Sequence, residues 1–418
     1  MFGCQSLGRA KSSIFSTITL AALIFIIYAF TIISNISLQS LTFDAKEISY
    51  VRIKSIASRL QLCFMQEEID QVPKTHQSWS LIPPLDVKKE ERIVFLKKPP
   101  EFKILYSSNL TKRFHGRVLE FFDLKCEVQF FMTWISPANS FGRRELSCME
   151  SLFDVHRRGC LMIISRTMDS VQGYRILKPI LDRGYKVRAV APDLSFLFKS
   201  TPAEAWFREI KSGHKDPGEI PLAQNLSNLI SLAILYKYGG IYLDTDFFVL
   251  KSFKGLRNSI GAQSIDSVSK KWTRLNNAVM VFDMNHPLLF EFMQEFASTF
   301  DGNKWGHNGP YLVSRVVENV EGRPGYNFTI LPPMAFYPVY WTRIERLFKK
   351  PKNWDDSSWV KGQLLQLSGE TYGVHLWNKL SSRFKIEEGS ILGSLISHHC
   401  VICDRIIALD EKKLTKKW

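Results

Sequence analysis

Two aspartates separated by a single residue are the side chains of this sequence best suited to binding a metal ion. Asp244 and Asp246 follow the apolar run 241–243. If these residues form one extended strand, the two carboxylates point to the same face about 7 Å apart, near the strand's C-terminal end. Because no Cys or His adjoins them, the pair favours a hard cation such as Mn²⁺ or Mg²⁺. Such an ion can bind a diphosphate and neutralise charge on a departing nucleoside diphosphate.

The Asp-x-Asp tripeptide does not identify such a site by itself. It is expected about once by chance in a chain of this length and composition. Two solvated carboxylates on a loop are the simple alternative interpretation. The segments around the pair therefore have to decide between a metal site and a loop.

The surrounding sequence predicts a sheet that would carry the aspartates at its edge. Short apolar runs of strand length alternate with stretches of helical length that end at glycine. The expected strands are 130–135, 161–165, 185–191 and 241–250, and the expected helices are 171–184 and 221–240. This alternation predicts an α/β fold with a mostly parallel sheet and right-handed crossovers. Open sheets of this kind bind ligands beyond the carboxyl ends of their strands, where the two aspartates are expected.

A long apolar run near the N-terminus predicts a membrane anchor. Residues 14–33 carry no charge and are long enough to cross about 30 Å of hydrocarbon as a helix. Arg9 and Lys11 precede the run and Asp44 is the first charge after it, so the positive-inside rule predicts a cytoplasmic tail, 1–13, and a lumenal remainder. A cleaved signal peptide is the alternative, but its apolar region would be shorter and would end in a small-residue cleavage site.

Composition divides the rest of the chain into a stem, a folded domain and a tail. Residues 34–125 contain proline pairs and mixed charge clusters, which are typical of an extended stem. A single folded domain is expected to follow, with a first half, 126–270, that carries the aspartate pair and a less regular second half, 271–404. A basic tail, 405–418, ends the chain.

The net charge invites a nucleic-acid interpretation, which the distribution of charge does not support. The chain has 55 Lys and Arg against 40 Asp and Glu, a formal charge of +15. The basic residues are dispersed, and the predicted topology would separate them from nucleic acid. We therefore expect no nucleic-acid partner.

The predicted topology also indicates which cysteines can form disulfides and which sequons can be glycosylated. Cys4 would be cytosolic, where it could be acylated. The other six could form up to three disulfides of undetermined connectivity; they are Cys63, Cys126, Cys148, Cys160, Cys400 and Cys403. The run His-His-Cys-x-x-Cys, 398–403, resembles metal ligands, but a disulfide is favoured in this compartment. Sequons at Asn35, Asn109, Asn225 and Asn327 predict an exposed, glycosylated lumenal chain, although Asn35 lies too near the membrane for easy glycosylation.

The block Leu-Tyr-Lys-Tyr-Gly-Gly-Ile-Tyr-Leu-Asp-Thr-Asp-Phe, 235–247, resembles the DXD block of the α-1,4-glycosyltransferase family, including its plant-type members. The resemblance continues in order through 224–228, 261–263, 275–278, 305–310, 331–333, 337–338 and 375–379. It implies a glycosyltransferase A-type fold in one domain and a UDP-sugar donor. It also implies a Golgi membrane protein of single-pass type II topology with a lumenal catalytic domain. The first half would bind the nucleotide sugar, and the second half would form the acceptor side.

The resemblance assigns Asp244 and Asp246 to the metal and to UDP. His375 is a candidate third metal ligand, because an imidazole complements two carboxylates. The alternative is an imidazole hydrogen-bonded beside Trp377. In the turn after strand 161–165, Arg166 stands where relatives carry a small residue, so it could tune or obstruct nucleotide binding.

Further candidates follow from the physical roles of the remaining blocks. Amides can bind sugar hydroxyls as donors and as acceptors, so the candidates for donor binding are Asn228, Asn276 and Asn277. The candidate catalytic residues are His307, Asn308 and Lys379. The first two could lie near the anomeric carbon or the acceptor hydroxyl, and the lysine could stabilise charge. Holding a turn or packing against a neighbour is the alternative for the asparagines and for the 305–310 block.

The resemblance implies a metal-dependent, retaining transfer of a hexose, galactose or N-acetylglucosamine, to a glycolipid or glycan through an α linkage such as α-1,4. Retention by double displacement needs a carboxylate nucleophile, and none in the matching late blocks has this position. Front-face substitution is therefore preferred. A catalytically weak, lectin-like Golgi protein that binds glycans is the alternative function. Association with itself or with other Golgi proteins is left open.

Overall fold

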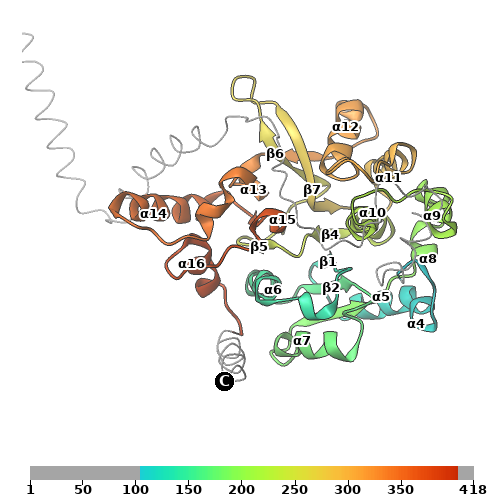
Figure 1. Cartoon of the computed structure of the whole chain (residues 1–418), viewed down its shortest axis with the longest axis horizontal. Helices are drawn as coiled ribbons and strands as arrows, with labels where there is room; N and C mark the ends of the chain where they lie inside the picture. Colours follow the sequence, from blue (N-terminus) through green and yellow to red (C-terminus); the bar gives the residue numbers. More distant parts are fainter. Residues whose placement is uncertain (1–103, 403–418) are drawn as a thin grey trace, which may run out of the picture. The chain divides into compact units, whose positions relative to one another are not determined.

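The computed structural model describes residues 104–402 (Figure 1). The anchor expected over 14–33, most of the expected stem and the basic tail lie outside the described residues. Within 104–402 no helix is both long and apolar enough to cross a bilayer. The structure therefore tests the expectations for the folded domain.

The folded domain alternates strands and helices through its first half. The strands are β1 (Gln129–Thr133), β2 (Cys160–Ile164), β3 (Lys186–Val190), β4 (Gly240–Leu243), β5 (Phe247–Val249), β6 (Ser259–Ile265), β7 (Trp272–Phe282), β8 (Thr329–Leu331) and β9 (Gly373–His375). The helices are α4 (Asn109–Lys112), α5 (Phe114–Phe122), α6 (Arg143–Val155), α7 (Val171–Leu181), α8 (Leu194–Phe198), α9 (Ala203–Ser212), α10 (Leu222–Tyr238), α11 (Pro287–Thr299), α12 (Pro310–Val320), α13 (Pro333–Phe336), α14 (Trp354–Gly369), α15 (Asn378–Ser381) and α16 (Ile391–His398). Two 3₁₀ turns, η3 (Ala138–Ser140) and η4 (Trp341–Leu347), complete the set.

Seven strands form the central sheet in the order β3-β2-β1-β4-β7-β6-β8 (Figure 1). The pairs among β3, β2, β1 and β4 are parallel, β7 is antiparallel to β4 and β6, and β8 is parallel to β6. The expected α/β fold with a mostly parallel sheet is confirmed. Because β2 and β3 lie on one side of β1 and β4 lies on the other, the strand order reverses between β1 and β4. Open α/β sheets bind ligands at such a point.

Alternate side chains of the parallel strands pack into two separate cores. Phe131 of β1 belongs to the core formed with α5, α10 and α11. Its neighbours Phe130 and Met132 belong to the core formed with α6 and α7. This follows from the two-residue period of a strand. It also explains the consecutive apolar residues of β1 and β2, since helices cover both faces of the sheet.

The strand expected over 241–250 is in fact two strands. β4 ends at Leu243 and belongs to the central sheet, whereas β5 begins at Phe247 and pairs with β9 in a separate two-stranded sheet. The aspartates lie in the turn between them. β4 also pairs with β7, so strands from both expected halves, 126–270 and 271–404, share one sheet and the halves are not separate folding units.

The expected stem, 34–125, extends too far toward the C-terminus. Phe114 and Val118 of α5 are completely buried, and Leu105 is 3% exposed. A disulfide joins Cys126 to Cys160 at the start of β2. The amphipathic α5 therefore packs as part of the domain, although its charged neighbours resemble those of a stem.

The end of the described chain is fastened to α6. The backbone N–H groups of Val401 and Ile402 donate to Glu150 Oε1 at 3.2 and 2.7 Å, and burial raises the pKa of Glu150. Cys400 is disulfide-bonded, as expected for this run, and its partner lies outside the described residues. Cys148 is a buried free thiol, so the six cysteines expected in the lumen form at most two disulfides and not three.

Candidate active site

The DXD pair lies in a turn at the carboxyl end of β4. The Asp244 N–H donates to the Ala278 carbonyl of β7 at 2.8 Å, and the Phe247 N–H donates to the Asp244 carbonyl at 3.0 Å. The sequence analysis placed both aspartates on one extended strand. This turn, and not strand alternation, directs the carboxylates of Asp244 and Asp246 toward one point.

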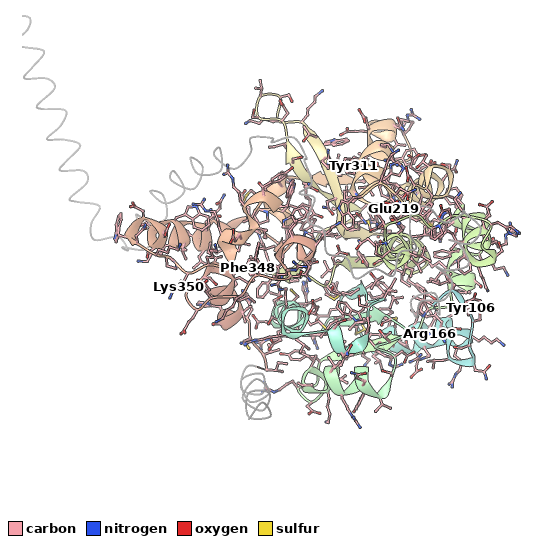
Figure 2. All side chains as sticks on the ribbon, in the orientation of Figure 1. Tyr106, Arg166, Glu219, Tyr311, Phe348 and Lys350 are labelled. Carbon is pink, nitrogen blue, oxygen red and sulfur yellow. A yellow bond between two sulfur atoms is a disulfide. The ribbon has the colours of Figure 1, made fainter. Side chains whose placement is uncertain are left out.

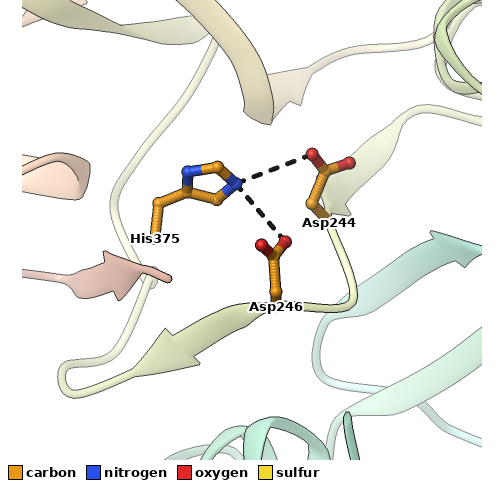
Figure 3. A group of neighbouring side chains, drawn as sticks. All are labelled: Asp244, Asp246 and His375. Carbon is orange, nitrogen blue, oxygen red and sulfur yellow. Dashed lines mark ion pairs between the residues drawn. The ribbon is translucent and has the colours of Figure 1, made fainter. Parts of the chain in front are cut away.

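His375 reaches this point from β9, far along the chain. β9 runs antiparallel to β5, with His375 opposite Phe247. Its Nε2 lies 3.3 Å from Asp246 Oδ1 and 3.8 Å from Asp244 Oδ2, as Figure 3 shows. One ligand atom of each residue lies within 4.8 Å of the others. The structure thus brings the three candidate metal ligands together.

This set of side chains fits a divalent cation. Two carboxylate oxygens and an imidazole nitrogen are ligands that Mn²⁺ and Mg²⁺ accept. Bonds of about 2.1 Å in an octahedron place neighbouring ligand atoms about 3 Å apart, close to the 3.3 and 3.8 Å separations from the imidazole nitrogen. Small movements of Asp244 or His375 would complete the geometry.

Hydrogen bonds hold the oxygens that do not face His375. The Tyr242 hydroxyl donates to Asp244 Oδ1 at 3.0 Å and lies 2.8 Å from Thr133 Oγ1 of β1. The Asn378 N–H donates to Asp246 Oδ2 at 2.7 Å. Each carboxylate therefore has one oxygen bound to the protein and one directed into the cluster.

The charges of the cluster depend on one another. Burial and the Asp246 carboxylate raise the pKa of Asp244 to about 7. Burial also acts to raise the pKa of Asp246, but the charge and hydrogen bond of His375 lower it. Burial acts to lower the pKa of His375, while the Asp246 carboxylate outweighs this and raises it. A cation bound here takes the place of these protons.

The cluster faces a cavity of roughly 480 Å³, within the size range of small-molecule sites. Its walls come from the end of β1, the first turns of α10, the middle of β7 and the segment from β9 into α15. Amides cover one part of the wall, namely Asn225, Asn228, Gln263, Asn276 and Asn277. Asn277 Nδ2 donates to Asn228 Oδ1 at 3.0 Å, and Asn276 Nδ2 donates to Gln263 Oε1 at 2.9 Å. All three candidates for donor binding thus border the same space as the DXD pair.

Of the three candidate catalytic residues, Lys379 borders the cavity and the other two do not. The Lys379 ammonium lies 2.8 Å from the centroid of the Trp305 ring, and desolvation lowers its pKa to about 8. His307 Nε2 donates to the Thr299 carbonyl at 2.8 Å, and Asn308 is 2% exposed. His307 and Asn308 therefore stabilise the loop before α12 through hydrogen bonds to the backbone. Their positions do not support direct contact with a substrate.

Arg166 also lies away from the cavity wall. Its guanidinium is 3.5 Å from the Tyr106 carbonyl, and Figure 2 shows the two residues side by side. The expectation that Arg166 approaches a nucleotide therefore has no support in this arrangement.

The sequon at Asn225 is not exposed, contrary to expectation. Asn225 is 3% exposed, and its Oδ1 accepts a hydrogen bond from Asn308 Nδ2 at 3.0 Å. Asn109 and Asn327 are exposed as expected. The sequence could have indicated this. Asn225 lies three residues before Asn228, a candidate for donor binding, and residues at this spacing share one face of a helix.

Sequence reasoning also missed Tyr242, Thr133 and Trp305. Tyr242 was counted with the apolar residues that lead into the pair, and its hydroxyl partner Thr133 comes from a strand more than a hundred residues earlier. Trp305 was not among the candidate site residues, but it is 40% exposed and lies on the cavity wall.

Comparison with known proteins supports a family assignment on both halves of the fold. Residues 142–266 match the glycosyltransferase sugar-binding region containing DXD motif, and residues 281–407 match the alpha 1,4-glycosyltransferase conserved region. The chain is 31% identical to the uncharacterized protein At4g19900 of Arabidopsis thaliana, over 68% of this chain and 43% of that protein.

Other relatives have names that state an activity. Lactosylceramide 4-alpha-galactosyltransferase of Pongo pygmaeus is 34% identical, over 51% of this chain and 94% of that protein. Alpha-1,4-N-acetylglucosaminyltransferase of Homo sapiens is 26% identical, over 50% of this chain and 58% of that protein. The chain spans about half the length of several of these relatives, 43% of the Arabidopsis protein and 58% of the rat galactosyltransferase. Both regions match, and a relative that is 34% identical is covered over 94% of its length, so the chain belongs to the α-1,4-glycosyltransferase family.

Proposed function

We propose that this protein is a metal-dependent retaining glycosyltransferase that uses a UDP-sugar. It transfers galactose or N-acetylglucosamine to a glycolipid or glycan acceptor through an α-1,4 linkage. The observation that carries the proposal is the cluster of Asp244, Asp246 and His375 on a cavity wall, in a chain of this family. The names of the galactosyl- and N-acetylglucosaminyl-transferase relatives support the two hexoses and the linkage.

The three ligand residues would hold Mn²⁺ or Mg²⁺ at the end of β4. The bound cation would supply positive charge beside the diphosphate of the donor. Tyr242 and the Asn378 N–H orient the carboxylates for this task before any ligand arrives, so only small movements are needed to complete the site. The sheet order, with its reversal between β1 and β4, supports the proposed glycosyltransferase A-type fold.

Lys379 and the wall amides would bind the donor. Lys379 is a cation on the cavity wall, and it would stabilise the charge that develops on the departing diphosphate. Asn228, Asn276 and Asn277 offer amide groups for the hydroxyls of the sugar and ribose.

The cavity favours front-face substitution over double displacement. Among the described residues that line it, Asp244 and Asp246 are the only carboxylates, and both face the metal cluster. In front-face substitution, the bond from the anomeric carbon to the diphosphate oxygen breaks while the acceptor oxygen bonds the same face of that carbon. The proton of the acceptor hydroxyl passes to the departing diphosphate. A glycosyl ester trapped on a carboxylate and found by mass spectrometry would contradict this mechanism.

We also propose that the protein is a single-pass type II Golgi membrane protein with its folded domain in the lumen. The support is the uncharged run 14–33 behind Arg9 and Lys11, together with the disulfide Cys126–Cys160, which suits an oxidising compartment. Protease treatment of sealed Golgi vesicles tests this topology. An epitope at the C-terminus should be protected, and its digestion would contradict a lumenal domain.

Turnover by the full-length chain tests the proposed activity. UDP release would be measured from UDP-galactose, UDP-N-acetylglucosamine and UDP-glucose, in Mn²⁺ and in EDTA. We expect release from one hexose donor in Mn²⁺, and loss of release in EDTA and in Asp244→Asn. Asp355→Asn is the matched control, because Asp355 is an exposed carboxylate in the first turn of α14 and should leave turnover unchanged.

The lectin-like alternative makes a different prediction. A folded protein that binds glycans but releases no UDP from any donor, with or without metal, would contradict the transferase and leave the glycan-binding function. Equal release by wild type and Asp244→Asn would contradict the role of the DXD pair.

A further inference from the structure

The loop between α11 and α12, residues 300–309, is tied to both helices. The imidazole of His307 donates to the Thr299 carbonyl at the end of α11 at 2.8 Å. Arg315 of α12 pairs with Glu295 of α11 at 2.8 Å, and its guanidinium donates to the His307 carbonyl at 3.4 Å. The position of the loop is therefore set by the packing of the two helices.

The middle of the same loop is fixed as well. The Asn308 amide accepts from the Asp301 N–H at 3.2 Å and donates to the Asp301 carbonyl at 2.8 Å, which closes the loop on itself. The Gly302 carbonyl accepts from the Ile220 N–H at 2.8 Å. A Cβ on Gly302 would lie 1.9 Å from the Pro217 carbonyl oxygen, so the two backbones are in direct contact. The loop cannot move outward without breaking these contacts.

This fixed loop presents one large aromatic side chain to the cavity. Trp305 lies on the cavity wall and is 40% exposed. The next residue, Gly306, has φ of +71°, and a Cβ there would lie 2.9 Å from the Tyr311 ring, so the turn is built tightly around glycine. Burial of an indole would stabilise the fold. An indole held exposed by so many contacts therefore suggests a ligand.

Lys379 sets where this ring stands relative to the cluster. Its ammonium covers one face of the indole, 2.8 Å from the ring centroid, and it follows His375 by four residues. Trp305 is 40% exposed with Lys379 in place, so part of its surface stays open although the lysine lies over the ring. A ligand on this open surface of the indole would lie close to Lys379, the residue proposed to stabilise the charge of the departing diphosphate.

We propose that the indole of Trp305 is the binding platform for the acceptor sugar, a hexopyranose whose C–H face lies against the ring. A pyranose has one such apolar face and a rim of hydroxyls, which suits a flat apolar surface beside a cavity lined with amides. This inference rests on the proposed function and assigns the acceptor contact of the 305–310 block to its tryptophan. His307 and Asn308 act through the loop and are positioning residues.

The test uses the full-length chain with UDP-galactose and Mn²⁺, and with lactose or lactosylceramide as acceptor. Trp305→Ala should raise the KM for both acceptors about tenfold, and should change the KM for UDP-galactose far less. Trp305→Phe should recover most of the loss, because it keeps an aromatic face. Trp354→Ala is the matched control, since that indole is 80% exposed at the start of α14 and does not border the cavity.

A binding measurement separates this proposal from the proposed activity. Saturation-transfer NMR would follow lactose and a set of methyl hexosides on wild type and on Trp305→Ala, with UDP and Mn²⁺ present. Loss of the signal in the variant supports the platform even if no transfer is detected. An unchanged signal or acceptor KM would overturn it, as would a wild type that binds no hexoside. An effect confined to lactosylceramide would also overturn it, because the ring would then bind the lipid and not the sugar.

Discussion

A hydroxyl inside the core holds the first aspartate of the DXD pair. The Tyr242 side chain is 2% exposed, and its hydroxyl lies between Thr133 Oγ1 and Asp244 Oδ1. A phenylalanine would fill the same volume, so packing alone does not explain the tyrosine. The hydroxyl directs Asp244 Oδ2 toward His375, which is the arrangement that a cation needs.

Tyr242→Phe should therefore weaken metal binding without unfolding the protein. Groups that orient metal ligands are worth about ten- to a hundredfold in metal affinity, and we expect about a tenfold rise in the Kd for Mn²⁺. Titration of free Mn²⁺ by electron paramagnetic resonance measures it. Tyr238→Phe is the control, because its hydroxyl contacts the exposed His115 and not the cluster. Equal Kd values for the two variants would refute the role of Tyr242.

Lys379 should make donor use depend on pH. Desolvation lowers its pKa to about 8, so the ammonium is charged below this pH and is lost as pH rises through it. We expect kcat/KM for the UDP-sugar, measured with Mg²⁺, to fall above about pH 8. Lys379→Arg should extend the active range upward, because a guanidinium stays charged. If kcat/KM falls at the same pH in wild type and in Lys379→Arg, a group other than Lys379 causes the loss of activity at high pH.

Local sequence patterns predict those strands and helices whose formation depends on residues close together in the chain. The strands expected at 130–135 and 161–165 and the helix expected at 221–240 are present within a few residues as β1, β2 and α10, because their apolar runs fit buried strands and a buried helix. The break at Asp244 depends on the Ala278 carbonyl of β7. No local pattern around 241–250 contains that contact, so one strand was expected.

The site required long-range information in the same way. His375 lies beside the DXD pair because β9 pairs with β5, and only resemblance to a family suggested it from sequence. The block 305–310 has residues on the cavity wall, but which of its side chains faces inward depends on contacts with Thr299 and Asp301. Residue type alone favoured His307 and Asn308 over Trp305.

The disulfide Cys126–Cys160 should stabilise the junction of α5 with the sheet. It closes a segment of 34 residues, for which loop entropy predicts about 3–4 kcal/mol. Cys126→Ser with Cys160→Ser should lower the free energy of unfolding in urea by about this amount. Under dithiothreitol, wild type and the variant should unfold alike, because the reductant breaks the other disulfide in both. Coincident unfolding curves for oxidised wild type and the variant would contradict the expected contribution.

For the whole molecule, burial decides which sequons of the folded domain can carry glycans. Asn109 and Asn327 are exposed, whereas Asn225 is 3% exposed on the cavity wall. We expect Asn109→Gln and Asn327→Gln each to remove one glycan, seen as a shift in mass. Asn225→Gln should cause no shift and should lower stability, because it breaks the hydrogen bond to Asn308. A glycan on Asn225 in the active protein would contradict this structure of the cavity.

Two segments of the chain, one before and one after residue 270, line a single cavity, which we propose binds the metal. The turn between β4 and β5 supplies the aspartates, and β9 supplies the histidine. Substitution of an aspartate or of the histidine should therefore weaken binding of the same ligand, a nucleoside diphosphate held through the cation.

The most direct test is calorimetry of UDP binding to the full-length chain, in Mn²⁺ and in EDTA, for wild type, Asp246→Asn and His375→Gln. We predict that UDP binds wild type in Mn²⁺, and that EDTA or either substitution weakens binding by more than about tenfold. UDP affinity that is the same in Mn²⁺ and EDTA, or unchanged in both variants, would contradict the metal-dependent site.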